Sequence, residues 1–262
     1  MIKNFSETGH VIIRNAISKN LIREIQNNIY DNLKIKKKSK NKRYLKFCNI
    51  VKKLKTSEYN FTKPLFESLH YKGLLEKMFL ENKFYKAVVD LMGKDLAFCT
   101  DTGITLNLPN KTNPKKNYLF KNWHQEIWSG ANPSTIQIWT PLIHKDSRHG
   151  QMELILDSHK WGHVPHMNRE AQLLPKKYKT KKLNLEYGDI IIFSTLLIHR
   201  SLPTQFPRLS LPILLKNFKS KDSSYQDNRS FKIYSYSEIT KIERILGNHF
   251  LTPFRLKDLD EE

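Results

Sequence analysis

The chain has 262 residues, 39% of them hydrophobic and 11% aromatic, and this composition predicts a folded globular protein rather than a disordered one. The formal net charge is +20, from 45 Lys and Arg against 25 Asp and Glu, which favours an anionic partner, although lysines scattered over a solvated surface would give the same total. Cys48 and Cys99 lie far apart without a Cys-x-x-Cys motif, which argues against a disulfide framework or a thiolate zinc site.

The first 93 residues are expected to form a helical layer that contains one short strand. The β-branched stretch HVIIRN (10–15) predicts that strand. The stretch SKNLIREIQNNIYDNL (18–33) predicts a helix, because its apolar residues recur at helical spacing and Ser18 is a suitable N-cap. The basic run KIKKKSKNKR (34–43) predicts an irregular loop, with a lid over an anionic substrate as the less favoured interpretation.

Apolar residues recur with a helical period in the stretch 65–92, with interruptions at Gly73 and near Asn82, so two or three helices are expected there. After this stretch the pattern changes to short β-type segments, separated by loops rich in Pro, Asn, Lys and Gly. We therefore expect one domain, with a double-sheet β core over about 94–220 and a polar, partly helical tail at 221–262. The predicted strands are LAFCT, ITLNL, TIQIWTPL, QMELIL, DIIIFS, LLIHRS and RLSLPILLKNF.

The stretch NWHQEIWSG (122–130) places His124 and Glu126 two residues apart, between two tryptophans. In a strand, residues i and i+2 point to the same face, so both side chains can reach one metal ion. For such a pair alone, a hydrogen-bonded core pair is the alternative. His199 is a third candidate ligand, because it ends an apolar strand in which a buried imidazole needs a partner. Two histidines and one carboxylate form the facial triad of non-haem iron oxygenases.

An iron enzyme of this type needs a group that holds an acidic cosubstrate. Arg208 follows His199 by nine residues and begins the next β segment, and an antiparallel neighbour at that distance can bring a guanidinium beside the metal. The planar guanidinium matches a carboxylate in bidentate geometry, which Lys does less well. Ser201 lies two residues after His199 and shares its face, so its hydroxyl can assist. A surface ion pair is the alternative role for Arg208.

Four stretches of the sequence form an ordered set of motifs: FSETGHVIIRNAISKNLIREI, then WHQE, then IWTPLIHKDSRHGQMELILDSHKWGHVPH, and finally LEYGDIIIFSTLLIHRS with the downstream Arg208. In this order they resemble the opening strand and helix, the His-x-Asp element, the Pro-Gly-Ser-His-Lys signature and the Gly-Asp strand with distal histidine of one enzyme family. This is the phytanoyl-CoA hydroxylase family of Fe(II)/2-oxoglutarate-dependent dioxygenases, which includes ectoine hydroxylase. The resemblance covers most of the chain.

The resemblance implies a mainly β fold with helices. Its core would be a double-stranded β-helix, that is, a cupin-like jelly roll, covered by the N-terminal helical layer. The implied reaction uses O2 and 2-oxoglutarate to hydroxylate a C–H bond of a small molecule, with release of succinate and CO2. The resemblance also implies the site residues, with His124, Glu126 and His199 as Fe(II) ligands and with Arg208, Ser201 and Asn107 as contacts of 2-oxoglutarate.

Two positions depart from the family pattern. Glu126 stands where the family has Asp, so its extra methylene must be absorbed by the side chain or the backbone. The stretch LDSH replaces Pro-Gly-Ser-His, and Asp157 can keep that turn because Asp tolerates positive φ better than most residues. Trp128 is predicted to line the substrate pocket, with a core position as an equally weighted alternative.

A non-catalytic basic binding protein on the same fold, with nucleic acid as a candidate partner, is the alternative function, supported by Glu126 and by the net charge of +20. An oxygenase that acts on nucleic acid is a third hypothesis. No apolar run is long enough to span a bilayer, and the N-terminus lacks the apolar run of a signal peptide. We therefore expect a cytoplasmic enzyme whose partner is a small molecule, with anionic character favoured by the charge.

Overall fold

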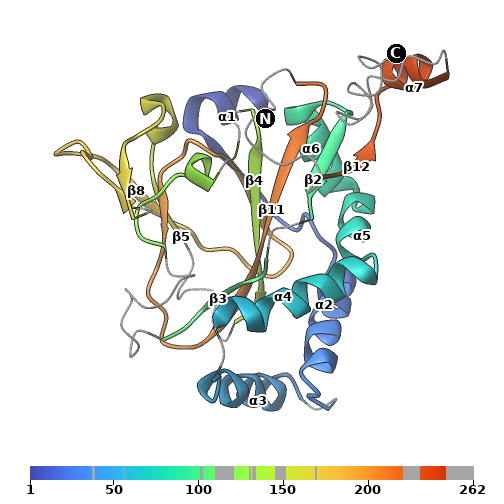
Figure 1. Ribbon diagram of the computed structural model, residues 1–262, viewed down its shortest axis with the longest axis vertical. Helices are drawn as coiled ribbons and strands as arrows, with labels where there is room; N and C mark the ends of the chain where they lie inside the picture. The colour runs from blue at the N-terminus through green and yellow to red at the C-terminus, as the bar shows by residue number, and fades with distance from the viewer. Residues whose placement is uncertain are drawn as a thin grey trace, which may run out of the picture.

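A β-sandwich with a helical layer on one of its faces forms the described part of the chain (Figure 1). No helix among these residues is long and apolar enough to cross a membrane. The computed structural model describes residues 1–36, 39–55, 57–100, 103–109, 121–129, 131, 134–144, 152–168, 170–220 and 231–245.

The larger sheet has seven strands among the described residues, and all of its printed strand pairs are antiparallel. Its path runs β1-β9-β4-β11-β2-β12, and β3 pairs with β11 beside this path. The long strand β11 therefore joins three neighbours and forms the centre of the sheet (Figure 1). In path order the strands are β1 His10–Ile13, β9 Ile190–Ser194, β4 Ile136–Ile143, β11 Arg208–Asn217, β2 Leu96–Cys99 and β12 Phe231–Ser235, with β3 at Thr105–Asn107.

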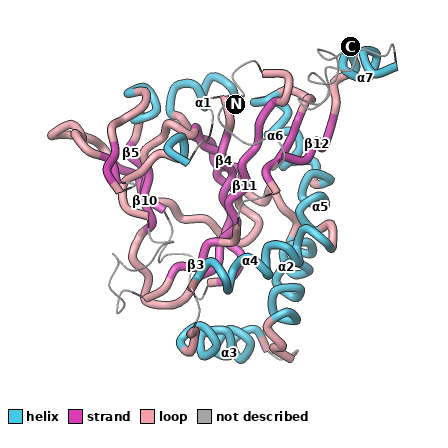
Figure 2. Tube along the Cα trace, viewed as in Figure 1, coloured by secondary structure: helices cyan, strands magenta, loops and turns pink. Residues whose placement is uncertain are grey.

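A smaller sheet, β10-β5-β8, forms the second layer (Figure 2). Its strands are β10 His199–Ser201, β5 Met152–Ile155 and β8 Thr180–Lys182. A cluster of buried apolar side chains contains members from β4 and β9 of the larger sheet and from β5 of the smaller one, so it lies between the sheets. This arrangement confirms the predicted jelly-roll core. The cluster consists of Trp139, Met152, Leu154, Leu183, Leu185, Ile191, Phe193 and Leu197.

The other face of the larger sheet packs against helices (Figure 1). Alternate residues of the sheet, such as Ile138, Ile192 and Leu211, belong to one buried cluster with Ile25 and Leu69 of the helices. The period of two in the strands and of 3.6 in the helices places these residues on facing surfaces. The helices are α1 Ile2–Thr8, α2 Lys19–Asn32, α3 Lys40–Lys52, α4 Glu58–Tyr71, α5 Leu74–Leu80, α6 Asn82–Met92 and α7 Glu238–Ile245.

Several local predictions are confirmed. Ser18 caps α2, because its hydroxyl accepts a hydrogen bond from the backbone N–H of Leu21. The expected helix breaks occur at Gly73, which has a φ of 64°, and at Asn82, where α6 begins. Asp157 has a φ of 61°, as the turn that replaces Pro-Gly-Ser-His requires.

The prediction of an irregular loop over residues 34–43 was wrong in part. Lys40 begins α3, so the basic run continues into a helix. The physical reason is the apolar period that starts directly after the run, because the buried residues of α3 recur at helical spacing and must face the core. Residues 37 and 38 lie outside the described part. The buried residues are Tyr44, Phe47, Cys48 and Val51.

Short elements were also missed. Helix α1 precedes the predicted strand, and β8 and β12 were not expected. The hairpin of β6 His166–Met167 and β7 Glu170–Ala171 was not expected either. These elements have two to seven residues, too few to show a clear hydrophobic period. In the tail, the helical prediction is confirmed by α7, whereas residues 221–230 and 246–262 lie outside the described part.

The Gly-Asp turn before β9 is fixed to the start of the chain. Gly188 has a φ of 92°, and a Cβ there would lie 2.5 Å from the carbonyl oxygen of Ile17. The carbonyl of Gly188 accepts a hydrogen bond from the N–H of Ile17 at 2.9 Å. The Asp189 carboxylate accepts from the N–H of Asn15 and from the Arg14 guanidinium. This turn therefore needs glycine for both its backbone angle and its close approach.

We expect Gly188→Ala to destabilise the protein more than Gly73→Ala does. Both glycines have positive φ, which costs other residues about 1–2 kcal/mol, but only Gly188 also has a backbone atom at the Cβ position. Nothing lies within 4 Å of the corresponding position at Gly73. The measurement is the free energy of unfolding in urea for both variants. Equal losses in the free energy of unfolding would show that the Ile17 carbonyl can move away from the added methyl group without cost.

Candidate metal centre

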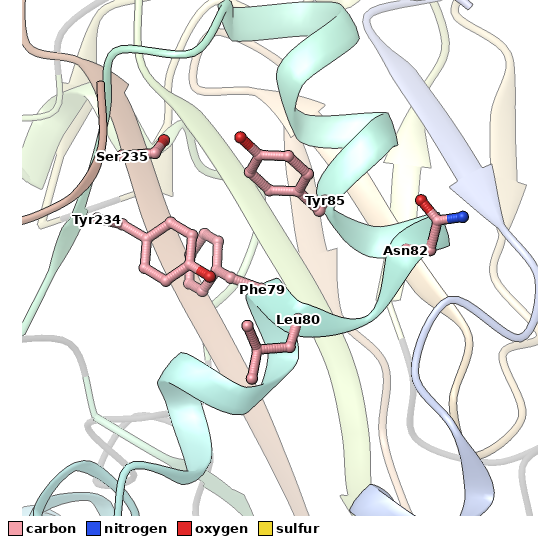
Figure 3. Close-up of a pocket in the computed structure, with 6 residues that line it drawn as sticks. All are labelled: Phe79, Leu80, Asn82, Tyr85, Tyr234 and Ser235. Carbon is pink, nitrogen blue, oxygen red and sulfur yellow. The ribbon is translucent and has the colours of Figure 1, made fainter. Parts of the chain in front are cut away.

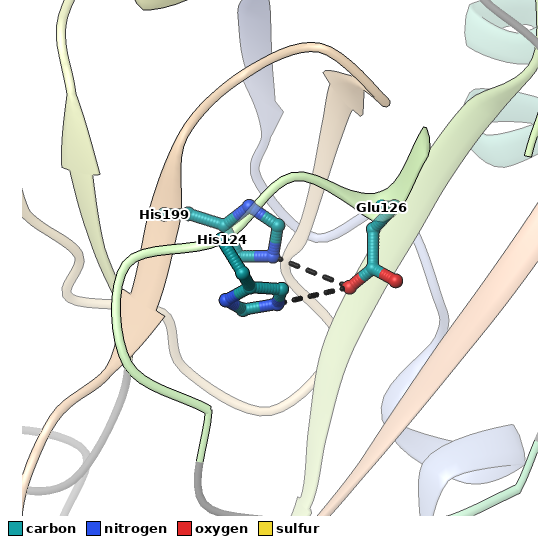
Figure 4. A group of neighbouring side chains, drawn as sticks. All are labelled: His124, Glu126 and His199. Atoms are coloured by element: carbon teal, nitrogen blue, oxygen red, sulfur yellow. Dashed lines mark hydrogen bonds and ion pairs between the residues drawn. The ribbon is translucent and has the colours of Figure 1, made fainter. Parts of the chain in front are cut away.

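Three side chains converge inside the sandwich (Figure 4). The Glu126 Oε1 atom lies 3.2 Å from His124 Nε2 and 3.4 Å from His199 Nε2. One candidate ligand atom from each residue lies within 4.8 Å of the others. Ligand atoms that each lie about 2.1 Å from one ion at right angles are separated by about 3 Å. The observed separations therefore fit ligands on one face of a single metal ion.

The backbone holds the two histidines against each other. His124 and His199 form an isolated antiparallel bridge, with reciprocal N–H to carbonyl hydrogen bonds of 2.9 and 3.0 Å. Glu126 lies in no strand, because it begins a 3-10 helix, Glu126–Ser129. The prediction that His124 and Glu126 share one face of a strand was therefore wrong in its backbone geometry. The two side chains converge nonetheless, since the chain turns at Glu126.

Backbone carbonyls fix the orientation of both imidazole rings. His124 Nδ1 lies 2.7 Å from the carbonyl oxygen of Asn122, and His199 Nδ1 lies 2.9 Å from that of Leu197. A carbonyl oxygen only accepts, so each Nδ1 donates its proton, and in a neutral ring Nε2 then carries a lone pair. Both Nε2 lone pairs face the carboxylate of Glu126. Three acceptors at these distances repel one another unless a cation lies between them.

The electrostatics of the centre favour a neutral His124 and an ionised Glu126. Burial, together with the neighbouring His199, lowers the pKa of His124 to about 4. Burial alone would raise the pKa of Glu126, but its neighbours, above all the Lys121 ammonium, outweigh burial and hold this pKa well below its usual range. Lys121 Nζ lies 3.2 Å from each carboxylate oxygen. A proton is therefore a poor cation for this centre at neutral pH, and a metal ion suits it better.

Arg208 is a buried cation with unused donors. It begins β11, is 2% exposed, and lies over the ring of Trp139 at 5.1 Å. Its Nη2 donates to Asn107 Oδ1 at 2.7 Å, across the register of β11 and β3. Its Nε and Nη1 atoms, and Nδ2 of Asn107, have no hydrogen-bond partner among the described residues. Burial lowers the pKa of Arg208 to about 9, because it disfavours the charged guanidinium. An anion beside the guanidinium would stabilise its charged form.

The sequence predicted that Arg208 lies on a strand adjacent to that of His199, and this prediction was wrong. Strand β10 pairs with β5 in the smaller sheet, whereas β11 lies in the larger one. Contacts across the sandwich still connect the two residues. Arg208 covers Trp139, which shares a buried cluster with Phe193, and the Phe193 ring meets the His199 ring edge-on at 4.7 Å. The guanidinium therefore belongs to the same interior as the metal centre.

Ser210 is a candidate that the sequence reasoning missed. Its hydroxyl is fully buried and has no hydrogen-bond partner among the described residues. It lies two residues after Arg208 on β11, so both side chains point into the sandwich. The Arg-x-Ser spacing was the available signal. Ser201, the predicted hydroxyl, lies half-buried on β10 opposite Met152.

Trp128 packs beside the centre in a small apolar cluster with Ile155 and Ile198. Its indole N–H donates to the carbonyl of Val164 at 3.0 Å, and its ring stacks on His166. These contacts hold the ring in place, and its contact with a substrate stays a prediction.

The sequence pattern of one family, phytanoyl-CoA dioxygenase (PhyH), matches residues 5–210. This range includes all three converging side chains and Arg208. The chain belongs to this family. It is therefore a non-haem iron enzyme that uses 2-oxoglutarate and O2, and the expected enzyme class is confirmed. No curated protein matches the sequence.

Two solved structures share the fold of this chain. The non-haem monooxygenase ThoJ is 16% identical, with 90% of this chain and 84% of that chain covered and a TM-score of 0.56. The epimerase SnoN, in a complex with Fe3+, α-ketoglutarate and nogalamycin RO, is 12% identical, with 82% of both chains covered and a TM-score of 0.58. At these low sequence identities, the similarity shows only that this chain shares their fold.

An open pocket elsewhere on the PhyH chain contains none of the predicted site residues (Figure 3). It lies where the end of α5 and the start of α6 meet β12, and half of its lining residues are aromatic. The lining residues are Phe79, Leu80, Asn82, Tyr85, Tyr234 and Ser235.

The metal-free protein should lose stability as the pH falls from about 6.5 to about 4. Burial lowers the pKa of His124 to about 4, so in this window the unfolded chain binds a proton that the folded protein does not. Stability from this group is present above pH 6.5 and is lost on acidification, by roughly 2–3 kcal/mol. Glu126 acts with the same sign at lower pH.

The measurement is urea unfolding of metal-free wild type and His124→Gln at several pH values. The variant should show a shallower dependence on pH, because it lacks the group that titrates. Parallel curves for the two proteins would show that His124 is not held neutral by burial.

Proposed function

We propose that His124, Glu126 and His199 bind Fe(II), and that the enzyme hydroxylates a C–H bond of a small, anionic metabolite with release of succinate and CO2. The observation that carries the proposal is the convergence of two imidazoles on one carboxylate. The Nε2 atoms of His124 and His199 both lie within 3.4 Å of Glu126 Oε1. Two histidines and one carboxylate are the ligand set of non-haem Fe(II) oxygenases. The set leaves three coordination positions for cosubstrate and O2.

Each protein group has a definable task. Bound iron supplies the activation of O2 that is coupled to decarboxylation of 2-oxoglutarate. The carbonyls of Asn122 and Leu197 hold the two imidazoles with Nε2 towards the ion. Lys121 keeps Glu126 ionised and restrains its carboxylate. Apolar residues between the sheets exclude water from the reacting centre.

Arg208 supports the assignment of the cosubstrate. Its Nε and Nη1 atoms and the Asn107 amide are buried donors that a carboxylate of 2-oxoglutarate would satisfy. Ser201 was predicted to add a hydroxyl, and we add Ser210, whose buried hydroxyl lies on the same face of β11 as Arg208. The net charge of +20 supports an anionic substrate, and Trp128 is proposed as part of the pocket wall. Likeness to ectoine hydroxylase within the family stays a prediction.

The alternative function was a basic binding protein that has lost the metal. Such a protein has no need to retain three ligand-type residues in contact. In this chain the ligand atoms converge, and Glu126 in place of Asp still reaches both imidazoles. This geometry favours the enzyme.

His199→Ala should abolish Fe(II) binding and the turnover of 2-oxoglutarate, because two ligands are too few for a stable site. The measurement is anaerobic Fe(II) titration, followed by succinate formation in air. Wild-type turnover by this variant would contradict the triad.

Glu126→Asp should retain part of the activity, whereas Glu126→Gln should lose metal affinity by at least about tenfold, since a neutral amide is a weaker ligand for a hard cation. The control is Glu153→Gln, which removes a buried carboxylate that pairs with Arg200. Equal metal affinity in wild type and Glu126→Gln would show that this carboxylate is not a ligand.

Arg208→Ala should weaken 2-oxoglutarate binding by roughly a hundredfold or more. Breaking a buried charge pair costs about 3–5 kcal/mol, and about 1.4 kcal/mol corresponds to a factor of ten. Arg208→Lys should recover part of the loss, because it keeps the charge without the planar fork. The measurement is isothermal titration of 2-oxoglutarate into Mn(II)-loaded, anaerobic protein.

Arg200→Ala is the matched control, because that guanidinium already pairs with Glu153 and lies over Trp123. Its affinity for 2-oxoglutarate should stay within threefold of wild type. If Arg208→Ala changed the affinity for 2-oxoglutarate by less than threefold, another residue would have to bind the cosubstrate.

A further inference from the structure

The positive charge of the chain is concentrated in one segment. Between Asp31 and Glu58 there are eleven Lys and Arg residues and no Asp or Glu. This segment therefore carries more than half of the net charge of +20. Elsewhere the 34 remaining basic residues face 25 acidic ones, since 45 minus 11 is 34. A compositional bias towards Lys would spread the excess of positive charge evenly along the chain. In this sequence the excess is instead concentrated between Asp31 and Glu58.

Helix α3 presents part of this segment as an ordered face. At 100° per residue, Lys42, Lys46 and Asn49 project opposite the buried side of the helix, and Lys53, the C-cap residue, continues this row. All four are exposed. At a rise of about 1.5 Å per residue, Lys42 and Lys53 lie about 17 Å apart along the helix axis. We call Lys42, Lys46, Asn49 and Lys53 the basic face of α3.

Within the described part of the chain, the lysines of this face make no ion pair. Lysines elsewhere do, as in Lys77 with Glu24 and Lys232 with Glu76. The ion pairs of the described residues include no residue between Asp31 and Glu58. The like charges on α3 repel one another, and a polyanion laid along the helix would relieve this repulsion.

Two other cations of α3 are already engaged in the fold. Arg43 donates to Asn27 and lies over the Tyr30 ring. Lys40 lies over the ring of Tyr187. These contacts tie the helix to the body of the protein. The basic face is therefore a fixed surface on a packed helix.

Helix α3 lies at the end of the sandwich where β3 ends and β11 begins (Figure 1). The Tyr44 hydroxyl donates to the carbonyl of Pro207 at 2.8 Å, one residue before Arg208. The basic face is therefore held to the same end of the larger sheet as Arg208 and Asn107.

We infer that the basic face of α3 docks the phosphate backbone of a nucleic acid, independently of the metal centre. Lysines and an exposed amide that recur every three or four residues suit a row of phosphates, since one strand of a duplex carries one phosphate per about 3.4 Å of its helix axis. An anionic membrane is the weaker fit, because a membrane-surface helix needs an apolar face. On α3 the exposed large hydrophobic side chain is Leu45, and the other apolar residues are buried or half-buried.

The test compares two triple variants of equal charge. Lys42→Gln/Lys46→Gln/Lys53→Gln removes the lysines of the basic face. Lys176→Gln/Lys177→Gln/Lys179→Gln removes three exposed lysines before β8 and is the matched control. Fluorescence anisotropy with a labelled 20-nucleotide single strand and the corresponding duplex gives the affinity between about 50 and 200 mM salt, the range over which phosphate contacts change affinity most visibly.

Removing the basic face should weaken binding at least tenfold and should make the slope of log K against log salt less negative by about 2–3, since each lost phosphate contact contributes about 0.7–0.9. The control triple variant should stay within threefold of wild type. His199→Ala should bind the oligonucleotides as wild type does, which separates this inference from the proposed iron chemistry. Thermal unfolding and Mn(II) affinity should be the same in both triple variants.

Equal losses in the two triple variants would overturn the inference, because binding would then follow net charge alone. It would also be overturned if wild type bound vesicles of phosphatidylcholine and phosphatidylserine in a 3:1 ratio, through the basic face, but bound neither oligonucleotide.

Discussion

The structure depends on an arrangement of acceptors that is unfavourable without a cation. The Nε2 atoms of His124 and His199 both lie within 3.4 Å of Glu126 Oε1, and both histidines are almost fully buried. The low dielectric of such a region strengthens their repulsion. The reciprocal backbone hydrogen bonds between His124 and His199 hold the rings in place against it. The fold thus holds three ligand-type groups in a preorganised set, and a metal ion between them would lower the free energy of this arrangement.

Arg208 creates the complementary problem on the opposite sheet. Its guanidinium is buried, and two of its nitrogens lack hydrogen-bond partners among the described residues. A buried cation of this kind is destabilising until an anion joins it. One ligand can satisfy both features if it coordinates a metal with one end and offers a carboxylate with the other. 2-Oxoglutarate has this form, so in the proposed complex it would satisfy both the acceptor cluster and the buried cation.

Local patterns predicted much of the fold, and pairing between distant segments was the part they could not supply. The helix after Ser18 and the strand at residues 190–194 follow from period, capping and β-branched residues, which act within a few positions. The sheet in which β10 lies depends on its pairing with β5, some 47 residues earlier, and no local pattern carries that information. The placement of Arg208 beside β10 was wrong for this reason. Helix α3 was missed because its lysines obscured an apolar period that only packing makes visible.

The site residues themselves were predictable as residue types, but the geometry of Glu126 was not. The extended backbone ends at this residue, where a 3-10 helix begins, so its side chain does not project in register with that of His124. A longer side chain is an advantage in that position, because it can reach back across the turn to place Oε1 3.2 Å from His124 Nε2. Lys121 also restrains the carboxylate, because its Nζ lies 3.2 Å from each oxygen. The replacement of the family's Asp by Glu is therefore consistent with a retained metal site.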